Sequence, residues 1–122
     1  MKAVWVMLGG SLGAGLRYGV TLLCVRWFGP GFPVGTLAVN LTGCFLIGVV
    51  MALAERTSLV TPAIRLFFVT GFLGGLTTFS SYAWESVNAF RSAGLGTAWI
   101  NVLANNLAGL GLVLAGFWVA RG

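Results

Sequence analysis

Four long apolar stretches make up most of the chain, and short turns containing glycine, proline or charged residues separate them. Each stretch offers the roughly 20 mostly apolar residues that a helix needs to cross a bilayer. The sequence therefore predicts an all-α membrane protein with one four-helix transmembrane domain over residues 1–122. The expected helices cover residues 3–27, 34–54, 62–91 and 97–120.

The third predicted helix contains a stretch that is poorly suited to a continuous helix. Gly74 and Gly75 are adjacent, and each weakens a helix interior by about 1 kcal/mol relative to alanine. The hydroxyls of the threonine and serine pairs that follow compete for backbone groups. In hydrocarbon, freed backbone groups are tolerated only where they face protein, an ion or water. We therefore expect the third helix to be broken at residues 74–78. The alternative is that the glycine pair only lets two helices approach closely.

Polar side chains inside the predicted helices indicate a route for a solute. Asn40 lies one helical turn beyond Thr36 on the second helix. On the fourth helix, Asn101 and Asn105 are four residues apart and share one face, whereas Asn106 points elsewhere. Three asparagines in apolar surroundings exceed what a single interhelical hydrogen bond requires, so the sequence predicts a polar track.

Aromatic and charged residues complete this track. Phe79 and Tyr82 are three residues apart beside Ser81, and aromatic rings carry a positive edge that can face an anion. Arg17 lies well inside the first helix, where a charge costs at least about 2.5–3.5 kcal/mol; it either faces a cavity or partner, or extends to the interface. Neutral amide and hydroxyl donors, without a ring of carboxylates, suit a small anion better than a cation.

Glycines spaced four residues apart predict close contacts between helices. Gly9 and Gly13 form one such pair on the first helix, and Gly15 and Gly19 form a second. Small residues at this spacing let helix backbones approach in lipid. We expect both pairs to have this structural role.

Composition excludes several classes of protein. Charged residues make up 7% of the chain, against about 25% in soluble proteins. The net charge is +5, but the basic residues are dispersed between apolar stretches, which argues against nucleic-acid binding. The chain has no histidine, and Cys24 and Cys44 both lie in apolar stretches. Neither a metal cluster nor a disulfide framework is indicated, and no nucleophile–base pair points to an enzyme.

Three stretches resemble the CrcB/Fluc family of fluoride channels, and the resemblance covers nearly the whole chain. They are Gly-Gly-Ser-Leu-Gly-Ala-Gly-Leu-Arg-Tyr at residues 9–18, Gly-Thr-Leu-Ala-Val-Asn-Leu-Thr-Gly at residues 35–43, and Gly-Phe-Leu-Gly-Gly-Leu-Thr-Thr-Phe-Ser-Ser-Tyr at residues 71–82, with Glu85 following. The third stretch is highly specific, whereas the first alone is a weak signal.

The resemblance implies a fluoride-selective channel that exports toxic cytoplasmic fluoride by passive permeation across the inner membrane of a prokaryotic cell. It implies that Asn40 lines the fluoride path, that Phe79 belongs to a stacked aromatic box and that Arg17 lies near the pore vestibule. It also implies that backbone carbonyls of Gly74 and Thr77 from two subunits hold one structural Na⁺, which is not transported.

The chain departs from the family pattern at three positions. Tyr82 stands where the family usually has phenylalanine, so the ring edge is kept and a hydroxyl is added. Asn101 and Asn105 stand where the family often has tyrosine and serine. The expected fluoride pathway comprises Arg17, Thr36, Asn40, Phe79, Ser81, Tyr82, Asn101 and Asn105.

A single chain has too few helices to enclose a pore and shows no internal repeat. Broken-helix ion sites normally lie between inverted halves, so a second, inverted chain is expected to supply the other half. Basic residues set orientation, and they are only modestly biased between the two sides. Four lie on one side and two on the other: Lys2, Arg56, Arg65 and Arg121 against Arg26 and Arg91. We therefore expect an antiparallel, dual-topology homodimer with two pores.

Two other functions are compatible with a small four-helix membrane protein. A proton-coupled drug or cation exporter needs a carboxylate within the membrane, on its first helix. Here the first helix has Arg17 instead, and Glu85 near the end of the third helix is a poor substitute. A small assembly subunit of a larger membrane complex is the other alternative, and transport by the purified protein alone would exclude it.

Overall fold

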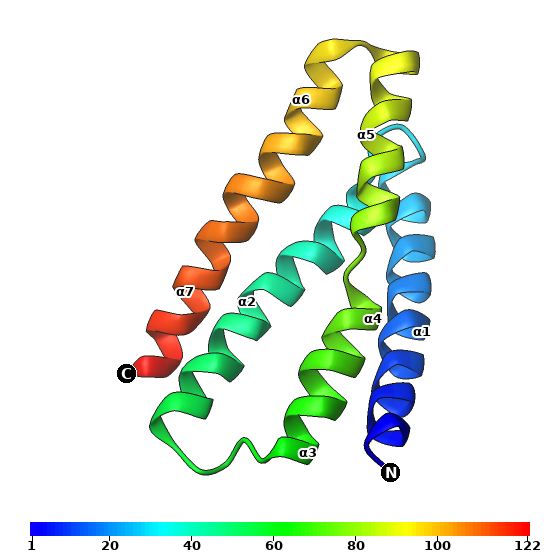
Figure 1. Ribbon diagram of the computed structural model, residues 1–122. Coiled ribbons are helices and arrows are strands. Elements are labelled where there is room, and N and C mark those ends of the chain that lie inside the picture. The colour runs from blue at the N-terminus through cyan, green and yellow to red at the C-terminus, as the bar shows by residue number, and fades with distance from the viewer.

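The computed structural model describes residues 1–122, and every long element in it is helical (Figure 1). Four helical segments are long and apolar enough to cross a membrane: residues 2–28, 34–56, 62–93 and 95–121. The first two are the α-helices α1 (Lys2–Phe28) and α2 (Val34–Arg56). The chain is thus a multi-pass membrane protein with four spans.

The third and fourth segments are built from shorter pieces. The third comprises α3 (Pro62–Ile64), the π-helical η1 (Arg65–Leu73), α4 (Gly74–Leu76) and α5 (Phe79–Ala93). The fourth comprises α6 (Leu95–Leu103), the π-helical η2 (Ala104–Ala108) and α7 (Gly109–Arg121). A π-helical stretch has wider turns than an α-helix and is frequent at functional sites.

Successive segments run in opposite directions, so both termini and the α2–α3 loop lie at one end (Figure 1). The segments associate as two pairs: α2 packs against α7, and α1 packs against η1 and α4. The pairs diverge toward the end that carries the termini (Figure 1). At the other end, α5 packs against α6.

Glycines allow the helices within each pair to touch backbone to backbone. A Cβ atom on Gly9 or Gly13 would overlap a carbonyl oxygen of η1, and one on Gly48 of α2 would overlap a carbonyl oxygen of α7. The expected packing role of the second pair on α1 is wrong for the isolated chain, because a Cβ on Gly15 or Gly19 meets nothing within 4 Å. Gly15 is two residues beyond Gly13, and at 100° per residue it faces nearly the opposite side of the helix.

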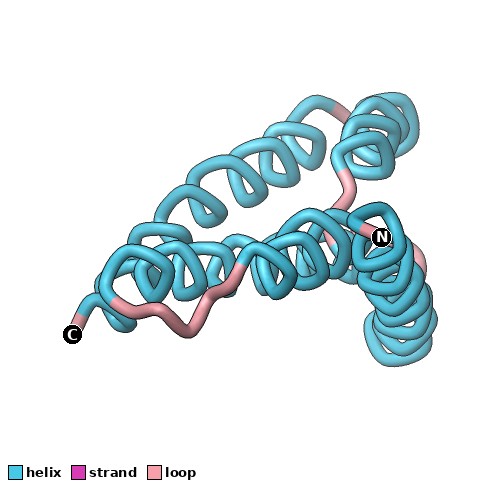
Figure 2. Tube along the Cα trace, turned by 60° about the horizontal axis from the view of Figure 1, so that its bottom comes forward, coloured by secondary structure: helices cyan, strands magenta, loops and turns pink.

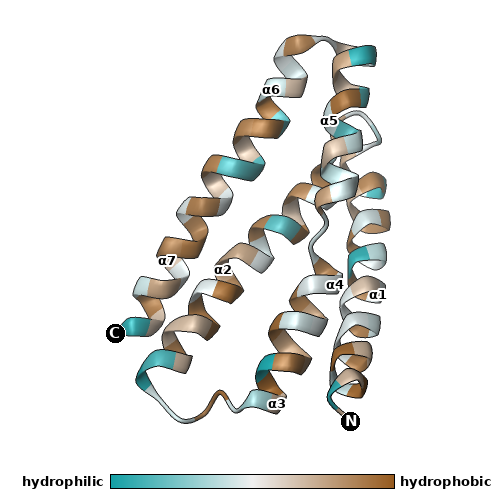
Figure 3. Ribbon diagram, in the orientation of Figure 1, coloured by the Kyte–Doolittle hydropathy of each residue, from teal (hydrophilic) through white to brown (hydrophobic).

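The rest of the helix surface matches a lipid environment. The small core consists of Val39, Leu73 and Leu76, with partly buried apolar residues around it. Large apolar side chains are exposed along the first, third and fourth segments, whereas the apolar side chains of α2 are buried or partly buried. Hydrophilic residues gather toward the helix ends, and few lie in between (Figure 3). Those few polar positions are therefore the ones that require explanation.

Two residues in the third segment leave the helix. Thr77 has φ −87° and ψ 155°, Thr78 has φ −149° and ψ 119°, and α5 begins directly after them. Figure 2 shows this short loop between two helical stretches. Gly74 and Gly75 are themselves helical, so the non-helical backbone lies at the threonine pair and not at the glycine pair. The reason lies in a side chain of α2, described below.

Candidate functional site

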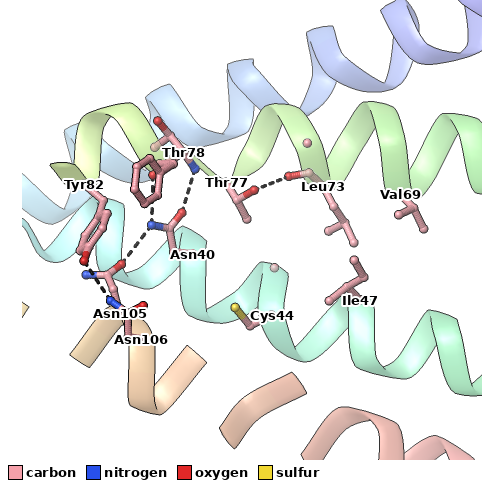
Figure 4. A pocket seen from close by; sticks show the side chains of 13 residues that line it. Asn40, Cys44, Ile47, Val69, Leu73, Thr77, Thr78, Tyr82, Asn105 and Asn106 are labelled. Carbon is pink, nitrogen blue, oxygen red and sulfur yellow. Dashed lines mark hydrogen bonds between the residues drawn. The ribbon is translucent and has the colours of Figure 1, made fainter. Parts of the chain in front are cut away.

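A polar cleft of about 410 Å³ lies beside the non-helical pair, between α2 and the third and fourth segments (Figure 4). Its walls carry amides, hydroxyls and aromatic rings at one end and the apolar side chains of Ile47, Val69 and Leu73 at the other, with no charged side chain (Figure 4). The lining residues are Asn40, Gly43, Cys44, Ile47, Val69, Leu73, Gly74, Thr77, Thr78, Phe79, Tyr82, Asn105 and Asn106.

Asn40 replaces the helical partners of Thr78. The Thr78 amide donates to Asn40 Oδ1 at 2.8 Å, and Asn40 Nδ2 donates to the Thr78 carbonyl at 3.2 Å (Figure 4). This pairing fixes the orientation of the side-chain amide, because each end meets a backbone group of opposite character. The extended backbone is therefore held by α2, and Asn40 is a support of the cleft as well as part of its wall.

The asparagines form a chain of hydrogen bonds that runs away from Asn40. Asn40 Nδ2 also donates to Asn105 Oδ1 at 3.0 Å, and Asn105 Nδ2 donates to Asn101 Oδ1 at 3.1 Å. Asn101 is 1% exposed and donates from Nδ2 to Ser86 Oγ at 2.9 Å. Asn105 thus lines the cleft, while Asn101 lies behind it and holds α6 to α5.

Asn106 belongs to the same cleft, and the expectation that it points elsewhere is wrong. Its Nδ2 donates to the Tyr82 hydroxyl at 2.9 Å, and both residues line the cleft (Figure 4). Asn106 lies within the π-helical η2. Because a π turn holds more residues than an α turn, the spacing rule for an α-helix misplaces this side chain. In the sequence, only its position directly after Asn105 indicated that Asn106 could lie near the same cleft.

The two aromatic residues of the predicted box lie close together. The ring centroids of Phe79 and Tyr82 are 5.4 Å apart and the rings are tilted by 58°. A tilted pair presents ring edges as well as faces, and the edges carry partial positive charge. Phe79 is 78% exposed in the isolated chain. The cleft is thus open on the side where this ring stands.

Arg17 does not line the cleft but contacts the end of α4. Its Nε donates to the Gly75 carbonyl at 3.0 Å, and the side chain is partly buried. The carbonyls at a helix C-terminus carry partial negative charge, which a cation stabilises. Of the two environments considered for Arg17, the structure gives it a partner inside the bundle.

Thr36 and Ser81 are placed outside the cleft. The Thr36 hydroxyl donates to Glu85 Oε2 at 3.0 Å, and both residues line a second cavity of about 240 Å³ next to the α1–α2 loop. Ser81 donates its backbone amide to Thr78 Oγ1 at 3.2 Å, which caps the start of α5. The Glu85 contact was missed, because no spacing rule relates residues on two different helices.

The backbone carbonyls of Gly74 and Thr77 lose the amides that a continuous helix would supply. The amide of Thr78 donates to Asn40, and that of Ser81 donates to the Thr78 hydroxyl. Gly74 is exposed and Thr77 is half-buried, and both line the cleft. Such freed carbonyls at a helix interruption are suitable ligands for a small cation.

The structure therefore gathers Asn40, Phe79, Tyr82 and Asn105 around one uncharged cleft and adds Asn106 to them. Chemically, this set can donate hydrogen bonds and present ring edges to a small solute. It has no carboxylate, histidine or lysine side chain, and the chain contains no cluster of three metal-binding side chains.

Comparison with known proteins identifies the family to which the chain belongs. The sequence profile of a family described as "CrcB-like protein, Camphor Resistance (CrcB)" matches residues 4–117. The protein "Fluoride-specific ion channel FluC" of Geobacter sp. (strain M21) is 43% identical over 120 residues, which cover 98% of this chain and 97% of that one. The proteins of the same name from Salinibacter ruber and Agrobacterium fabrum are 47% and 42% identical. Those matches cover 95% of this chain and 86% and 93% of theirs.

Proposed function

Because the chain belongs to the CrcB-like family, whose relatives are named as ion channels and not as enzymes, we propose that it is a fluoride-selective ion channel. The observation that carries this proposal is the polar cleft, an uncharged set of amides, hydroxyls and ring edges within a four-span membrane protein. Fluoride is small and accepts hydrogen bonds strongly, so a cleft with hydroxyl donors and ring edges suits it better than it suits chloride.

Permeation is passive in this proposal, so fluoride leaves the cell down its electrochemical gradient. Neutral donors hold an anion weakly enough for it to move on, whereas a fixed positive charge would retain it. Coupled export of protons would need a titratable group in the path. The one carboxylate nearby, Glu85, is hydrogen-bonded to Thr36 in the second cavity and does not line the cleft.

A second, antiparallel copy completes each pathway. In the isolated chain the cleft is open beside Phe79, so its amides and freed carbonyls would face hydrocarbon, which membrane proteins do not tolerate. A two-fold axis relating the two copies would bring their non-helical pairs, Thr77 and Thr78, together at the centre of an antiparallel homodimer with two pores. The modest bias of basic residues, four at the end with the termini against two at the other, permits both orientations.

One structural Na⁺ at the centre of the dimer would stabilise the two interruptions. The carbonyls of Gly74 and Thr77 fit this role, since their helical amides are diverted elsewhere. Two copies of each supply four hard oxygen ligands, and the ion would neutralise the ends of two α4 helices. The ion is not transported in this proposal, because four oxygen ligands from two subunits hold it in place.

Ion efflux from liposomes containing only this protein tests the function. Fluoride and chloride electrodes should record rapid fluoride release and little chloride release, with no requirement for a pH gradient. Equal efflux of the two anions would refute fluoride selectivity, and efflux only with an imposed pH gradient would refute passive permeation. Release by the purified protein also excludes the role of an assembly subunit.

Cysteine labelling tests the proposed topology. Cys24 and Cys44 lie in the helices α1 and α2 and are partly buried, so a variant with both replaced by serine provides the background. A cysteine added at either terminus should react with an impermeant reagent from both sides of the membrane. Labelling from one side only would eliminate the dual-topology arrangement, even if fluoride transport were observed.

A further inference from the structure

The hydroxyl of Tyr82 has a fixed hydrogen-bond direction. Its oxygen accepts from Asn106 Nδ2 at 2.9 Å, and an amide N–H₂ group can only donate. Asn106 Nδ2 also donates to the Val102 carbonyl at 2.8 Å, one turn back on the same segment. The amide is thereby held in place, and the hydrogen of the Tyr82 hydroxyl remains for another acceptor.

Most other donors of the cleft are already used within the chain. Both hydrogens of Asn40 Nδ2 are directed to protein oxygens, as are the contacts of Asn105 Nδ2. The Thr77 hydroxyl donates to the Leu73 carbonyl at 2.8 Å. Two hydroxyl hydrogens remain, those of Thr78 and Tyr82, and the Thr78 oxygen is engaged in capping α5. The Tyr82 hydroxyl is therefore a free side-chain donor that takes no part in capping a helix.

We propose that the Tyr82 hydroxyl, oriented by Asn106, donates a hydrogen bond to the permeating anion in the polar cleft. This inference rests on the proposed fluoride function. A hydroxyl that accepts a hydrogen bond becomes a better donor, because hydrogen bonds in a chain polarise one another. The pair thus extends the aromatic contact of Phe79 and Tyr82 with one directional donor, and the π-helical η2 brings Asn106 within reach of Tyr82.

A double-mutant cycle in liposomes tests this proposal. The rate of fluoride efflux is measured against fluoride concentration for wild type, Tyr82→Phe, Asn106→Leu and the double variant. Tyr82→Phe removes only the hydroxyl and should raise the half-saturating fluoride concentration about tenfold, which corresponds to about 1.4 kcal/mol. Asn106→Leu should raise it by about threefold. The double variant should resemble Tyr82→Phe alone, because the amide acts through the hydroxyl.

Tyr18→Phe is the matched control. It removes the hydroxyl of the other tyrosine in the chain, which is exposed on α1 and lies outside the cleft, and the efflux curve should not change. If Asn106→Leu does not fold, Asn106→Ala replaces it in the cycle with the same expected result.

Two results would overturn the proposal. One is an unchanged half-saturating concentration for Tyr82→Phe. The other is equal effects of the two single substitutions on efflux, each matched by the same loss of dimer stability, which would show that the Tyr82–Asn106 bond only joins two helices. Failure of the proposed function is distinguishable, because the wild-type protein itself would then release no fluoride.

Discussion

Substitution of Asn40 by aspartate is the most informative test of the polar cleft. The change keeps the size of the side chain and the oxygen that accepts from the Thr78 amide at 2.8 Å. It replaces the Nδ2 donor with a second carboxylate oxygen. The Nδ2 group now donates to the Thr78 carbonyl at 3.2 Å and to Asn105 Oδ1 at 3.0 Å, so the new oxygen would face two acceptors. An ionised carboxylate at this position thus meets two oxygens and adds a negative charge to an uncharged cleft.

The structure separates the expected effects on stability and on transport. Interhelical hydrogen bonds in membrane proteins average about 0.6 kcal/mol and reach about 1.7 kcal/mol, so the loss of two donors destabilises the fold by about 1–3 kcal/mol. A fluoride ion about 5 Å from the new charge, at an effective dielectric constant of about 20, is repelled by about 3 kcal/mol. That repulsion corresponds to efflux roughly 100-fold slower. The expected effect on transport thus lies at the upper end of the range expected for folding, and normalising efflux to folded protein separates the two.

The assay combines fluoride-electrode efflux, normalised to folded protein, with thermal unfolding in detergent followed by size-exclusion chromatography. Asn88→Asp provides the control, because it makes the same chemical change on an exposed residue of α5 that lies outside the cleft. Fluoride efflux within about threefold of wild type for Asn40→Asp would refute the placement of this residue in the anion path. Unchanged thermal stability would refute its role in holding the extended backbone.

Three further substitutions test separate features. Gly13→Val should abolish the peak of folded protein in size-exclusion chromatography, because a side chain there overlaps the backbone of η1. Gly15→Val is the control, since it has open space and should fold. Normal folding of both variants would contradict the close packing of α1. Phe79→Ala should lose most fluoride efflux with little loss of thermal stability, since the ring is 78% exposed in the isolated chain; normal efflux from well-folded dimers would disprove the aromatic contact. Arg17→Gln removes the cation at the end of α4 and should lower the free energy of unfolding by about 1–3 kcal/mol. A titration of unfolding with SDS measures this change, and wild-type stability would show that the contact contributes nothing.

The amino-acid sequence alone determined the class of the fold. Runs of apolar residues long enough to cross a bilayer are a local property, and the four predicted spans differ from the observed segments by no more than two residues at any end. Asn40 and Asn105 were selected in the same way, because a polar residue inside such a run is costly unless it has a function or a partner.

Contacts between helices were decided only by the tertiary structure. The non-helical backbone lies at Thr77 and Thr78, and not at the glycine pair, because Asn40 on α2 supplies the groups that satisfy Thr78. The wide turns of η2 bring Asn106 to the Tyr82 hydroxyl, which an ideal helical wheel does not predict.

The hydrogen-bond partners of the polar side chains likewise depend on how one segment packs on another. Arg17 meets the Gly75 carbonyl, and Thr36 meets Glu85, through contacts that join residues 58 and 49 positions apart. Hydrophobicity specifies which residues enter the membrane, since it depends on each side chain and its near neighbours. Which polar groups satisfy one another there depends on how the helices pack, and that packing is a property of the whole folded chain.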